Sequence, residues 1–455
     1  MAHALAASRN VTVVELGGPV SSMQARIRDV GHPARLDPHV GAGLGGTTAL
    51  WHNGLIEVDE DVFARRWPVP RAEIEPWYEA AYPLLSGTTR AAVVEAGSVL
   101  RRLHERAGLH VDGAPQMFVP THRRNLWRSL ALEGRVRVVT ADAVRLEMDG
   151  ASRVRCVVVR ESGREARIAS EQFVLAAGGL GTPPLLQTLG AGAGLSSLRN
   201  AGRYYEDHPM ACVGVLKLRA PLYRFWNYAA AGTGGTIRLP LVVRHRGIHV
   251  GFQLRPASLL QREARKNRLG SVITQLRNDP LNPIHYFRLL ARPDDILDIL
   301  SFRFGIRVPT RLYSLLMVAE QPPSEGRAVW AEGDPALGTT VIHRKWEVSP
   351  GYLATLQEAI GRFVEGLGDL VLDARLFPDW SSTVQTAAHH SGTARMSASP
   401  EQGVCDSDGR VHGLENLYVA DGSLIPGSGI ANTGLTIAAL ALRTAHRLCT
   451  NGRSR

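Results

Sequence analysis

The chain has 455 residues, of which 44% are hydrophobic and 21% charged, which is typical of a soluble globular protein with two or three domains. Its formal net charge is +10, but the arginines are spread along the chain, which argues against a nucleic-acid interface. The four cysteines are far apart and form no C-x-x-C pair. This argues against a zinc site or a disulfide framework, so we expect no metal and a reducing, cytoplasmic compartment. No run approaches the roughly 20 apolar residues of a membrane span.

The first fifteen residues predict a helix followed by a strand. MAHALAAS is helix-like, and the β-branched run in RNVTVVE ends in Glu15 before a Gly-Gly-Pro stop. A helix, a strand and a terminal acid form the second half of a βαβ nucleotide-binding unit, in which the acid binds a ribose hydroxyl. The first strand of such a unit and its G-x-G-x-x-G turn should precede the helix, and this sequence does not contain them.

A glycine-rich segment, GAGLGGTTALWHNG, follows over 41–54, and a helical, more polar region covers roughly 71–107. From 136 to 177 the pattern predicts strands, the last of which ends in Ala176-Ala177-Gly178-Gly179 before the expected start of a helix. A strand, small residues and a helix start bring backbone close to a cofactor. We therefore expect a second cofactor contact at this point.

Residues from about 212 to 384 change character. Alternating runs such as VGVLKL, IRLPLVV and IHVGFQL predict an antiparallel sheet with helices. The basic, amphipathic segment over 294–316 predicts a helix packed on this domain, and a helix lying on a membrane surface is the alternative.

The stretch from His389 to Leu442 carries the strongest functional signal. Two histidines, His389 and His390, precede a Ser-Gly-Thr turn, a hydrophobic strand runs into Asp421, and Asn432 stands at the start of an apolar helix. Histidine suits a general base because its unperturbed pKa is about 6.5. Asparagine at a helix start is also a good N-cap. A base, an acid at a strand end and an amide at a helix start indicate one wall of an active site.

Four segments, in this order, resemble the glucose–methanol–choline (GMC) oxidoreductases, which bind FAD and oxidise alcohols. They are VTVVE, GLGGTTALWHNG, VLAAGGLGTPPLLQTLG and the block from His389 to Leu442. The resemblance implies an α/β fold with a doubly wound, Rossmann-like FAD-binding domain and an inserted α+β substrate domain on an antiparallel sheet. The FAD-binding domain would be discontinuous, comprising 1–60, 130–210 and 389–455. The substrate-binding domain and cap would comprise 61–129 and 211–388.

The resemblance also implies which residues carry the chemistry. His389 falls on the family's H-x-x-G-[TG] pattern and would take the hydroxyl proton while a hydride passes to flavin N5. Asn432 falls on the second catalytic position, where an amide hydrogen-bonds the substrate hydroxyl. His390 is a further catalytic candidate without a defined role. The family has Asn-Pro where this chain has Asn432-Thr433, so the loop geometry stays open.

The same resemblance implies a set of FAD contacts. Asp421 and Gly422 would face the ribityl or pyrophosphate part, and the helix from Thr433 would point its positive end at the flavin pyrimidine ring. The predicted cofactor-binding residues are Glu15, Gly45, Gly46, Thr47, Asn53, Gly54, Val144, Ala177, Gly178, Asp421, Gly422, Asn432 and Thr433.

Some members of the family attach FAD covalently through a histidine just before a tryptophan. Leu50 precedes Trp51 here, so we expect non-covalent FAD, with His52 as the nearby alternative.

The expected reaction is oxidation of an alcohol on a sugar, polyol or glycoside, because HHSGTARM and SGIANTGLTIAALALR are close to the sugar-acting side of the family. Sterols or other lipophilic alcohols are an alternative, and Phe225, Trp226 and Tyr228 could line either pocket. A catalytically inactive, flavoprotein-like binding module is an alternative of a different class. The electron acceptor stays open among oxygen, a quinone and a carrier protein.

Three interpretations of the front of the nucleotide-binding unit are open. A strand and glycine turn could lie upstream of Met1. The protein could be a natural short form that binds FAD poorly, or a partner chain could complete the unit. The loss of a central strand would expose the edges of its neighbours.

Overall fold

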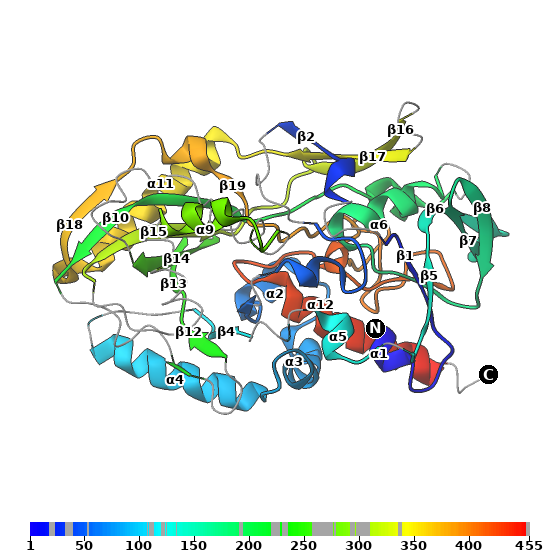
Figure 1. Cartoon of the computed structure of the whole chain (residues 1–455), viewed down its shortest axis with the longest axis horizontal. Helices are drawn as coiled ribbons and strands as arrows, with labels where there is room; N and C mark the ends of the chain where they lie inside the picture. Colours follow the sequence, from blue (N-terminus) through cyan, green and yellow to red (C-terminus); the bar gives the residue numbers. More distant parts are fainter. Residues whose placement is uncertain are drawn as a thin grey trace.

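The computed structural model describes residues 1–17, 23–31, 40–51, 54–106, 108, 113–119, 123, 125–132, 134–190, 194–219, 228–229, 235–256, 276, 279–291, 296, 310–334 and 339–451. A large antiparallel sheet occupies one side of the molecule, and short parallel strands with their helices occupy the other (Figure 1). This arrangement confirms the expected α/β fold.

The antiparallel sheet has six strands in the order β13-β14-β15-β10-β18, with β19 paired to the free end of β10. Its strands are β10 (Pro209–Leu218), β13 (Leu241–His245), β14 (Ile248–Pro256), β15 (Leu312–Ala319), β18 (Val371–Leu376) and β19 (Gln385–Thr386). Helix α11 (Pro350–Gly366) packs on it, and the rings of Phe252 and Phe363 stack with centroids 4.1 Å apart. The predicted sheet over 212–384 is therefore present.

Two pairs of parallel strands form the nucleotide-binding side. β1 (Thr12–Glu15) pairs with β5 (Arg137–Thr140), and β9 (Phe173–Leu175) pairs with β20 (Leu417–Val419). Among the described residues, β1 pairs with β5 alone and β9 with β20 alone. The other edge of β20 is bridged by 409–411, whereas β1, β5 and β9 each keep one edge that no described strand covers.

Helices follow these strands as a doubly wound fold requires. α6 (Gly178–Gln187) comes directly after β9, and α12 (Thr433–Asn451) comes after β20 and the short 3₁₀ turn η8 (Gly422–Leu424). The predicted N-terminal helix is α1 (Ala2–Leu5), which packs against α12, as Figure 1 shows. A three-stranded antiparallel sheet, β6 (Asp142–Asp149), β7 (Arg153–Glu161) and β8 (Arg164–Ala169), extends this side.

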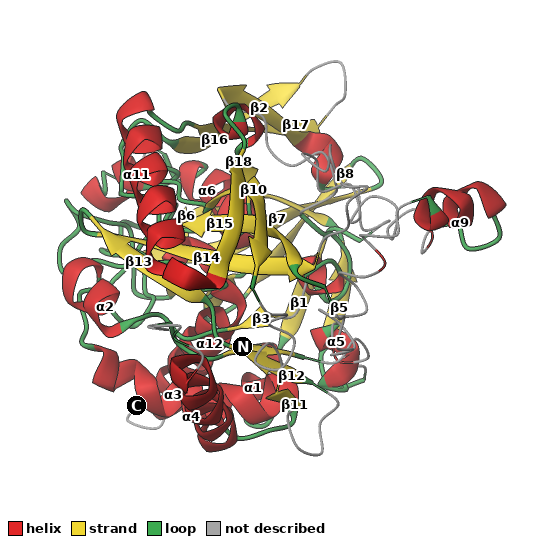
Figure 2. Ribbon diagram, turned by 90° about the vertical axis from the view of Figure 1, so that its left-hand side faces the viewer, coloured by secondary structure: helices red, strands yellow, loops and turns green. Residues whose placement is uncertain are grey.

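The remaining elements connect the two sides. α3 (Arg71–Ser86) and α4 (Arg90–Arg106) confirm the predicted helical region, α2 (Glu60–Arg66) precedes it, and α3 packs against α12. A four-stranded sheet has the order β11-β12-β4-β3, and a three-stranded sheet has the order β16-β17-β2. Their strands are β3 (Gly54–Leu55), β4 (Gln116–Phe118), β11 (Tyr228–Ala229), β12 (Thr236–Arg238), β2 (Ile27–Gly31), β16 (Ala328–Asp334) and β17 (Thr339–Trp346). The short helices are α5 (Leu126–Ser129) and α9 (Pro283–Leu290), and α9 stands away from the sheets in Figure 2.

Two sequence predictions need correction. The amphipathic segment over 294–316 is not a helix throughout, because 312–316 belongs to β15 and alternates buried and half-buried side chains between β10 and β14. Most of the segment before it lies outside the described residues. The run IRLPLVV is not one strand, since Pro240 cannot donate a ladder hydrogen bond and the chain passes from β12 in one sheet to β13 in another.

No helix in the described part of the chain is long and apolar enough to cross a membrane.

Candidate active site

A cavity of about 1870 Å³ lies where four segments meet. They are the strand that ends in Glu15, the glycine-rich segment over 41–54, the turn after β9 and the block from His389 to Leu442. The cavity is larger than the roughly 300–1,000 Å³ of an ordinary small-molecule pocket. Both parallel strand pairs contribute to its wall, through residues such as Val13 of β1 and Val174 of β9. Ten of the predicted cofactor-binding residues line it: Glu15, Gly45, Gly46, Thr47, Val144, Ala177, Gly178, Asp421, Gly422 and Thr433.

The glycines at the cavity wall are of two kinds. Gly45 and Gly178 have φ values of +97° and +79°, and a Cβ built on Gly178 would meet nothing within 4 Å, so this backbone is open to the cavity. Gly179 and Gly422 instead allow close packing, because a Cβ on either would lie 2.6 Å from the carbonyl oxygen of His390. The glycines thus expose backbone to the cavity and hold the histidine turn against its wall.

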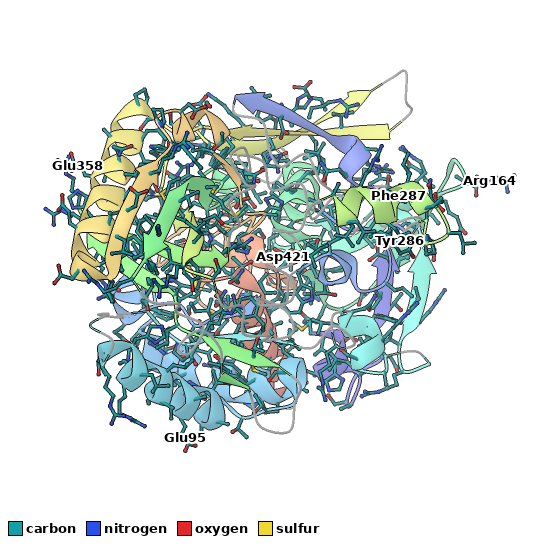
Figure 3. The ribbon with its side chains drawn as sticks, turned by 60° about the vertical axis from the view of Figure 1, so that its left-hand side comes forward. Glu95, Arg164, Tyr286, Phe287, Glu358 and Asp421 are labelled. Carbon is teal, nitrogen blue, oxygen red and sulfur yellow. The ribbon has the colours of Figure 1, made fainter. Side chains whose placement is uncertain are left out.

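Asp421 ties two elements of the wall together and lies in the middle of the molecule (Figure 3). Its Oδ2 accepts hydrogen bonds from the Gly178 amide at 2.8 Å and the Thr182 hydroxyl at 2.5 Å. Its Oδ1 accepts from the amide and the hydroxyl of Ser423, at 2.8 and 2.5 Å. The carboxylate therefore fixes the start of α6 against η8, and in this structure all its contacts are with protein donors.

The histidine turn is held in a strained backbone conformation. Ala388, directly before His389, has φ +64°, which a residue with a Cβ rarely adopts. The turn pairs with the segment leading into β10, where the Ala387 amide donates to the His208 carbonyl and the His389 amide donates to Asp207 Oδ1. Fixed backbone on both sides of His389 limits where its ring can lie.

The side chain of His389 meets Asn432 at the start of α12. Asn432 Nδ2 lies 2.7 Å from His389 Nε2, and Gln116 Nε2 donates to Asn432 Oδ1 at 2.6 Å. Gly54 lies beside this pair, since a Cβ there would come within 3.1 Å of Asn432 Oδ1. The structure therefore brings the predicted base and the predicted amide together, with Gly54 at the amide rather than in the cavity wall.

A second set of buried groups lies behind His389. His389 Nδ1 lies 2.8 Å from His208 Nδ1, and His208 Nε2 lies 3.0 Å from the Ser428 hydroxyl. Burial lowers the pKa of His208. Burial alone would raise the pKa of Asp207, but contacts with His390 and His389 hold it well below its usual range. The neutral His208 and the ionised Asp207 form the support behind the predicted base, His389.

His390 points away from Asn432, into this support. Its Nδ1 lies 3.0 Å from Asp207 Oδ2 and 2.8 Å from the Tyr205 hydroxyl. Burial lowers the pKa of His390, although Asp207 acts in the opposite direction. Since His390 binds Asp207 and packs its backbone on Gly179 and Gly422, its geometry fits a supporting role, although it also lines the cavity.

Residues 325–441 match the family model described as GMC oxidoreductase. This match covers about a quarter of the chain, at its C-terminal end. The chain is similar to 6'''-hydroxyparomomycin C oxidase of Streptomyces lividus, with 42% identity over 67 residues, 15% of this chain and 12% of that one. It is similar to oxygen-dependent choline dehydrogenase of Escherichia coli O17:K52:H18, with 24% identity over 308 residues, 57% of this chain and 47% of that one. The matches thus span about half the length of these relatives or less.

Solved structures share the GMC fold. Pyridoxine 4-oxidase from Mesorbium loti superposes with a TM-score of 0.60 and 17% identity, over 99% of this chain and 96% of that one. A formate oxidase variant from Aspergillus oryzae RIB40 superposes with a TM-score of 0.57 and 16% identity, over 100% and 96%. FAD is the cofactor of this family, and the cavity, its open glycine backbone and the start of α12 fit such a group.

Several supporting residues were not predicted from the sequence. Gln116, Asp207, His208 and Ser428 come from β4, the lead into β10 and the loop before α12, and no local motif marks them. The dipeptide Asp207-His208 directly before a strand is the one signal that could have been noticed. The predicted Asn53 and its neighbour His52, like Phe225 and Trp226, lie outside the described residues, as does the side chain of Tyr228.

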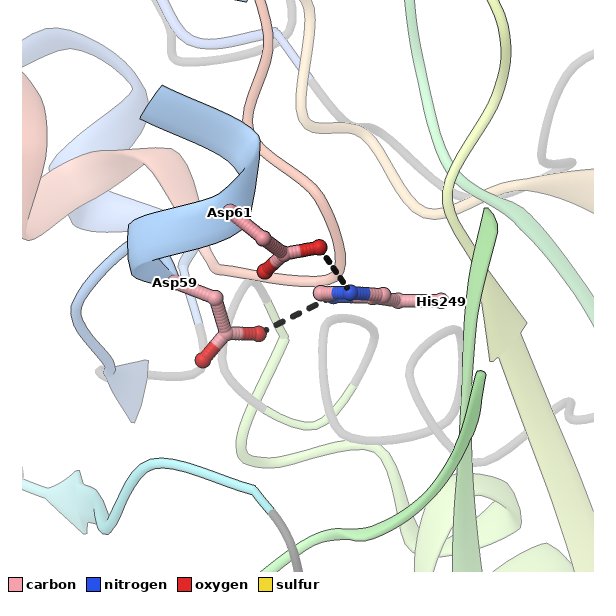
Figure 4. A group of neighbouring side chains, drawn as sticks. All are labelled: Asp59, Asp61 and His249. Atoms are coloured by element: carbon pink, nitrogen blue, oxygen red, sulfur yellow. Dashed lines mark hydrogen bonds and ion pairs between the residues drawn. The ribbon is translucent and has the colours of Figure 1, made fainter. Parts of the chain in front are cut away.

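A separate cluster lies beyond the supporting residues, where α2 meets β14. His249 is 1% exposed, with Nδ1 3.0 Å from Asp59 Oδ2 and Nε2 2.8 Å from Asp61 Oδ2 (Figure 4). These three side chains bring possible ligand atoms within 4.8 Å of one another. Both ring nitrogens already face carboxylates, and Arg65 pairs with Asp61 at 3.5 Å, so the cluster matches its charges internally. It is an ion-pair cluster that fixes α2 to the sheet.

Proposed function

We propose that the chain performs FAD-dependent oxidation of an alcohol, with His389 as the base. The single observation that carries this proposal is the contact between His389 Nε2 and Asn432 Nδ2 at the start of α12, whose Thr433 lines the cavity. The two positions are 43 residues apart in sequence, and both fall on the family's catalytic pattern. The proposal includes a catalytic role for both residues.

The hydrogen bonds define what His389 offers to a substrate. With Asn432 Oδ1 occupied by Gln116, Asn432 presents its NH₂ group to His389 Nε2, which must therefore carry a lone pair. A substrate hydroxyl placed between the two would donate its proton to His389 Nε2 and accept from Asn432 Nδ2. The alcohol thus replaces the contact between the two side chains, and its oxygen keeps a donor as the proton leaves.

The remaining residues would bind and orient the cofactor. Gly45, Gly46 and Gly178 would let backbone approach its diphosphate, and Glu15 would bind the ribose. FAD would supply the hydride acceptor, flavin N5, when bound. The positive end of α12, behind Thr433, would favour negative charge near the pyrimidine ring by roughly 0.3–1 kcal/mol, and by up to about 2 kcal/mol when partly buried. Binding is proposed to be non-covalent, since Leu50 precedes Trp51.

The proposed substrate is a hydroxyl group of a sugar, polyol or glycoside. The relative at 42% identity, named for the oxidation of 6'''-hydroxyparomomycin C, supports this choice, although that match covers only 67 residues. Choline dehydrogenase and pyridoxine 4-oxidase among the similar proteins support the broader assignment to small-molecule CH–OH donors.

The test is the visible spectrum of the purified protein after incubation with FAD and desalting. We expect flavin absorption that a sugar alcohol or glycoside bleaches under anaerobic conditions, and that trichloroacetic acid releases into the supernatant. The variant His389→Gln should keep the flavin bands and lose the bleaching. Protein that stays folded and colourless would overturn the assignment and favour a binding module. Bleaching by sterols alone would move the substrate to lipophilic alcohols.

A further inference from the structure

A chain of side-chain contacts runs through His389 from one side of the site to the other. Gln116 Nε2 donates to Asn432 Oδ1 at 2.6 Å, and Asn432 Nδ2 contacts His389 Nε2 at 2.7 Å. His389 Nδ1 lies 2.8 Å from His208 Nδ1, and His208 Nε2 lies 3.0 Å from Ser428 Oγ. Each ring nitrogen in the chain has a named partner, so the position of one proton fixes the next.

The direction of these hydrogen bonds follows from the amide end. Gln116 donates to the Asn432 oxygen, so Asn432 donates to His389 Nε2, which has no proton in the neutral ring. The proton of neutral His389 is then on Nδ1 and is donated to His208 Nδ1. His208 in turn carries its proton on Nε2 and donates it to the Ser428 hydroxyl.

The environment keeps His208 suited to accept. Its side chain is 2% exposed, and burial lowers its pKa, which favours the neutral ring that the hydrogen-bond directions require. Asp207 fixes its position, because Asp207 Oδ1 accepts from both the His208 amide at 2.8 Å and the His389 amide at 3.0 Å. One carboxylate oxygen therefore sets the backbone of both histidines, and their rings meet edge to face at 76°.

We propose that His208 is a positioning residue that sets the tautomer of the base, holding the proton of His389 on Nδ1 so that Nε2 faces the substrate with a lone pair. This inference rests on the proposed function of His389. In other catalytic triads a carboxylate fills the place behind the histidine and selects its tautomer. Here a neutral imidazole fills it. When the hydroxyl proton moves to Nε2, the O–H bond breaks, an N–H bond forms, and His208 still accepts from Nδ1–H.

The first experiment observes the tautomer directly and needs neither flavin nor turnover. Protein with ¹⁵N-labelled histidine side chains is compared with His208→Leu, which removes the acceptor, and with His208→Asn, whose side-chain oxygen can replace Nδ1. The His389→Gln spectrum identifies the His389 signals. We expect a protonated Nδ1 and a bare Nε2 in the wild type, a shift toward the Nε2–H tautomer in His208→Leu, and the wild-type pattern restored in His208→Asn. Unchanged His389 nitrogen shifts in His208→Leu would overturn the proposal.

The second experiment measures steady-state kinetics of the flavin-loaded protein. We expect kcat of His208→Leu to fall about 10²- to 10³-fold, as when a triad loses the correct tautomer, with KM within about twofold of the wild type. The acid limb of its pH–rate profile should move to lower pH, since the imidazolium of His389 loses an acceptor. His208→Asn should recover most of kcat, whereas equal losses in both variants would indicate a merely structural role.

A control variant and the order of the tests separate the two proposals. His446→Gln, on the exposed face of α12, should leave the tautomer and the kinetics as in the wild type. If no alcohol is oxidised but the nitrogen shifts respond to His208 as expected, the proposed function fails and the positioning role stands. If alcohols are oxidised but His208→Leu has wild-type shifts, the positioning role fails alone.

Discussion

Asn432 Nδ2 lies 2.7 Å from His389 Nε2. The two groups hydrogen-bond to each other, so an alcohol bound by this proposed catalytic pair would have to separate them. The hydrogen bond between Asn432 Nδ2 and His389 Nε2 would be lost. In its place, Asn432 Nδ2 would donate to the hydroxyl oxygen and His389 Nε2 would accept from the hydroxyl proton. One donor and one acceptor at this point would suit a hydroxyl group, as the proposed function requires.

The amide orientation of Asn432 depends on Gln116. The substitution Gln116→Met keeps the volume and removes the donor to Asn432 Oδ1, so the Asn432 amide can turn its oxygen toward His389 Nε2. We expect kcat/KM to fall about tenfold or more, in line with about 1–2 kcal/mol for one lost buried hydrogen bond. Steady-state kinetics with a bleaching alcohol would measure it. Gln253→Met, on β14 of the antiparallel sheet, is the matched control, and an equal loss there would contradict this role.

The four hydrogen bonds of Asp421 predict a large structural effect of a small change. In Asp421→Asn the amide nitrogen cannot accept, so two donors among Gly178, Thr182 and Ser423 lose their partner. We expect the free energy of unfolding to fall by about 2–3 kcal/mol. Urea denaturation monitored by tryptophan fluorescence measures it, with Asp373→Asn on the exposed part of β18 as control. A stability equal to that of the control would disprove the tie between α6 and η8.

Alanine substitutions at two glycines distinguish the effect of close packing on stability from the effect of backbone flexibility. In Gly179→Ala the new Cβ would lie 2.6 Å from the His390 carbonyl oxygen, so we expect a loss of about 1–3 kcal/mol through overpacking. Gly361→Ala, in the interior of α11 with nothing within 4 Å of the new Cβ, should instead stabilise by about 0.4–1 kcal/mol. Thermal denaturation of both variants compares the signs. The same sign for both would show that close packing at the histidine turn is not limiting.

The ion-pair cluster at α2 predicts a pH-dependent stability. Burial opposes protonation of His249, but contact with Asp59 and the charges of Asp59, Asp61 and Glu320 outweigh it and raise its pKa above 6.5. A raised pKa in the folded state stabilises fully below the unfolded value, about 6.5, and the contribution is lost as pH rises through the folded value.

The variant His249→Gln isolates the contribution of the imidazole charge to stability. The basic groups near the ring are Arg65 and Arg244. The difference in free energy of unfolding between wild type and variant should be largest at pH 5–6 and should shrink toward pH 9, as measured by urea titrations across this range. A difference that is independent of pH would mean that His249 acts through packing alone.

Local patterns were enough to predict most of the fold and the two side chains, His389 and Asn432, that the structure brings into contact. The strand ending in Glu15, the glycine segment, the turn after β9 and the pair His389 and Asn432 each have a short sequence signature, and the family's catalytic pattern joined the last two. The boundary errors came from non-local effects. Residues 312–316 of an amphipathic segment became a central strand because β10 and β14 cover both of its edges.

The residues behind the base could not be predicted in the same way. Gln116, His208 and Ser428 are ordinary residues of a strand, a strand entry and a loop, and only the tertiary fold places them at His389. Their importance lies in the direction of a hydrogen bond, which composition and spacing do not encode. His390 shows the converse, since its neighbour made it a catalytic candidate while the fold directs its ring to Asp207.

Flavin bound in the cavity shared by β1 and β9, as proposed, would couple cofactor supply to the stability of the protein. A ligand that binds only the folded chain stabilises it in proportion to the logarithm of its concentration over its dissociation constant. Because this cavity is lined by both parallel strand pairs, flavin bound there would hold together two parts of the chain that no described strand joins. Riboflavin starvation of the cell should then shorten the lifetime of the protein against proteases, so its abundance would report the flavin status of the cell.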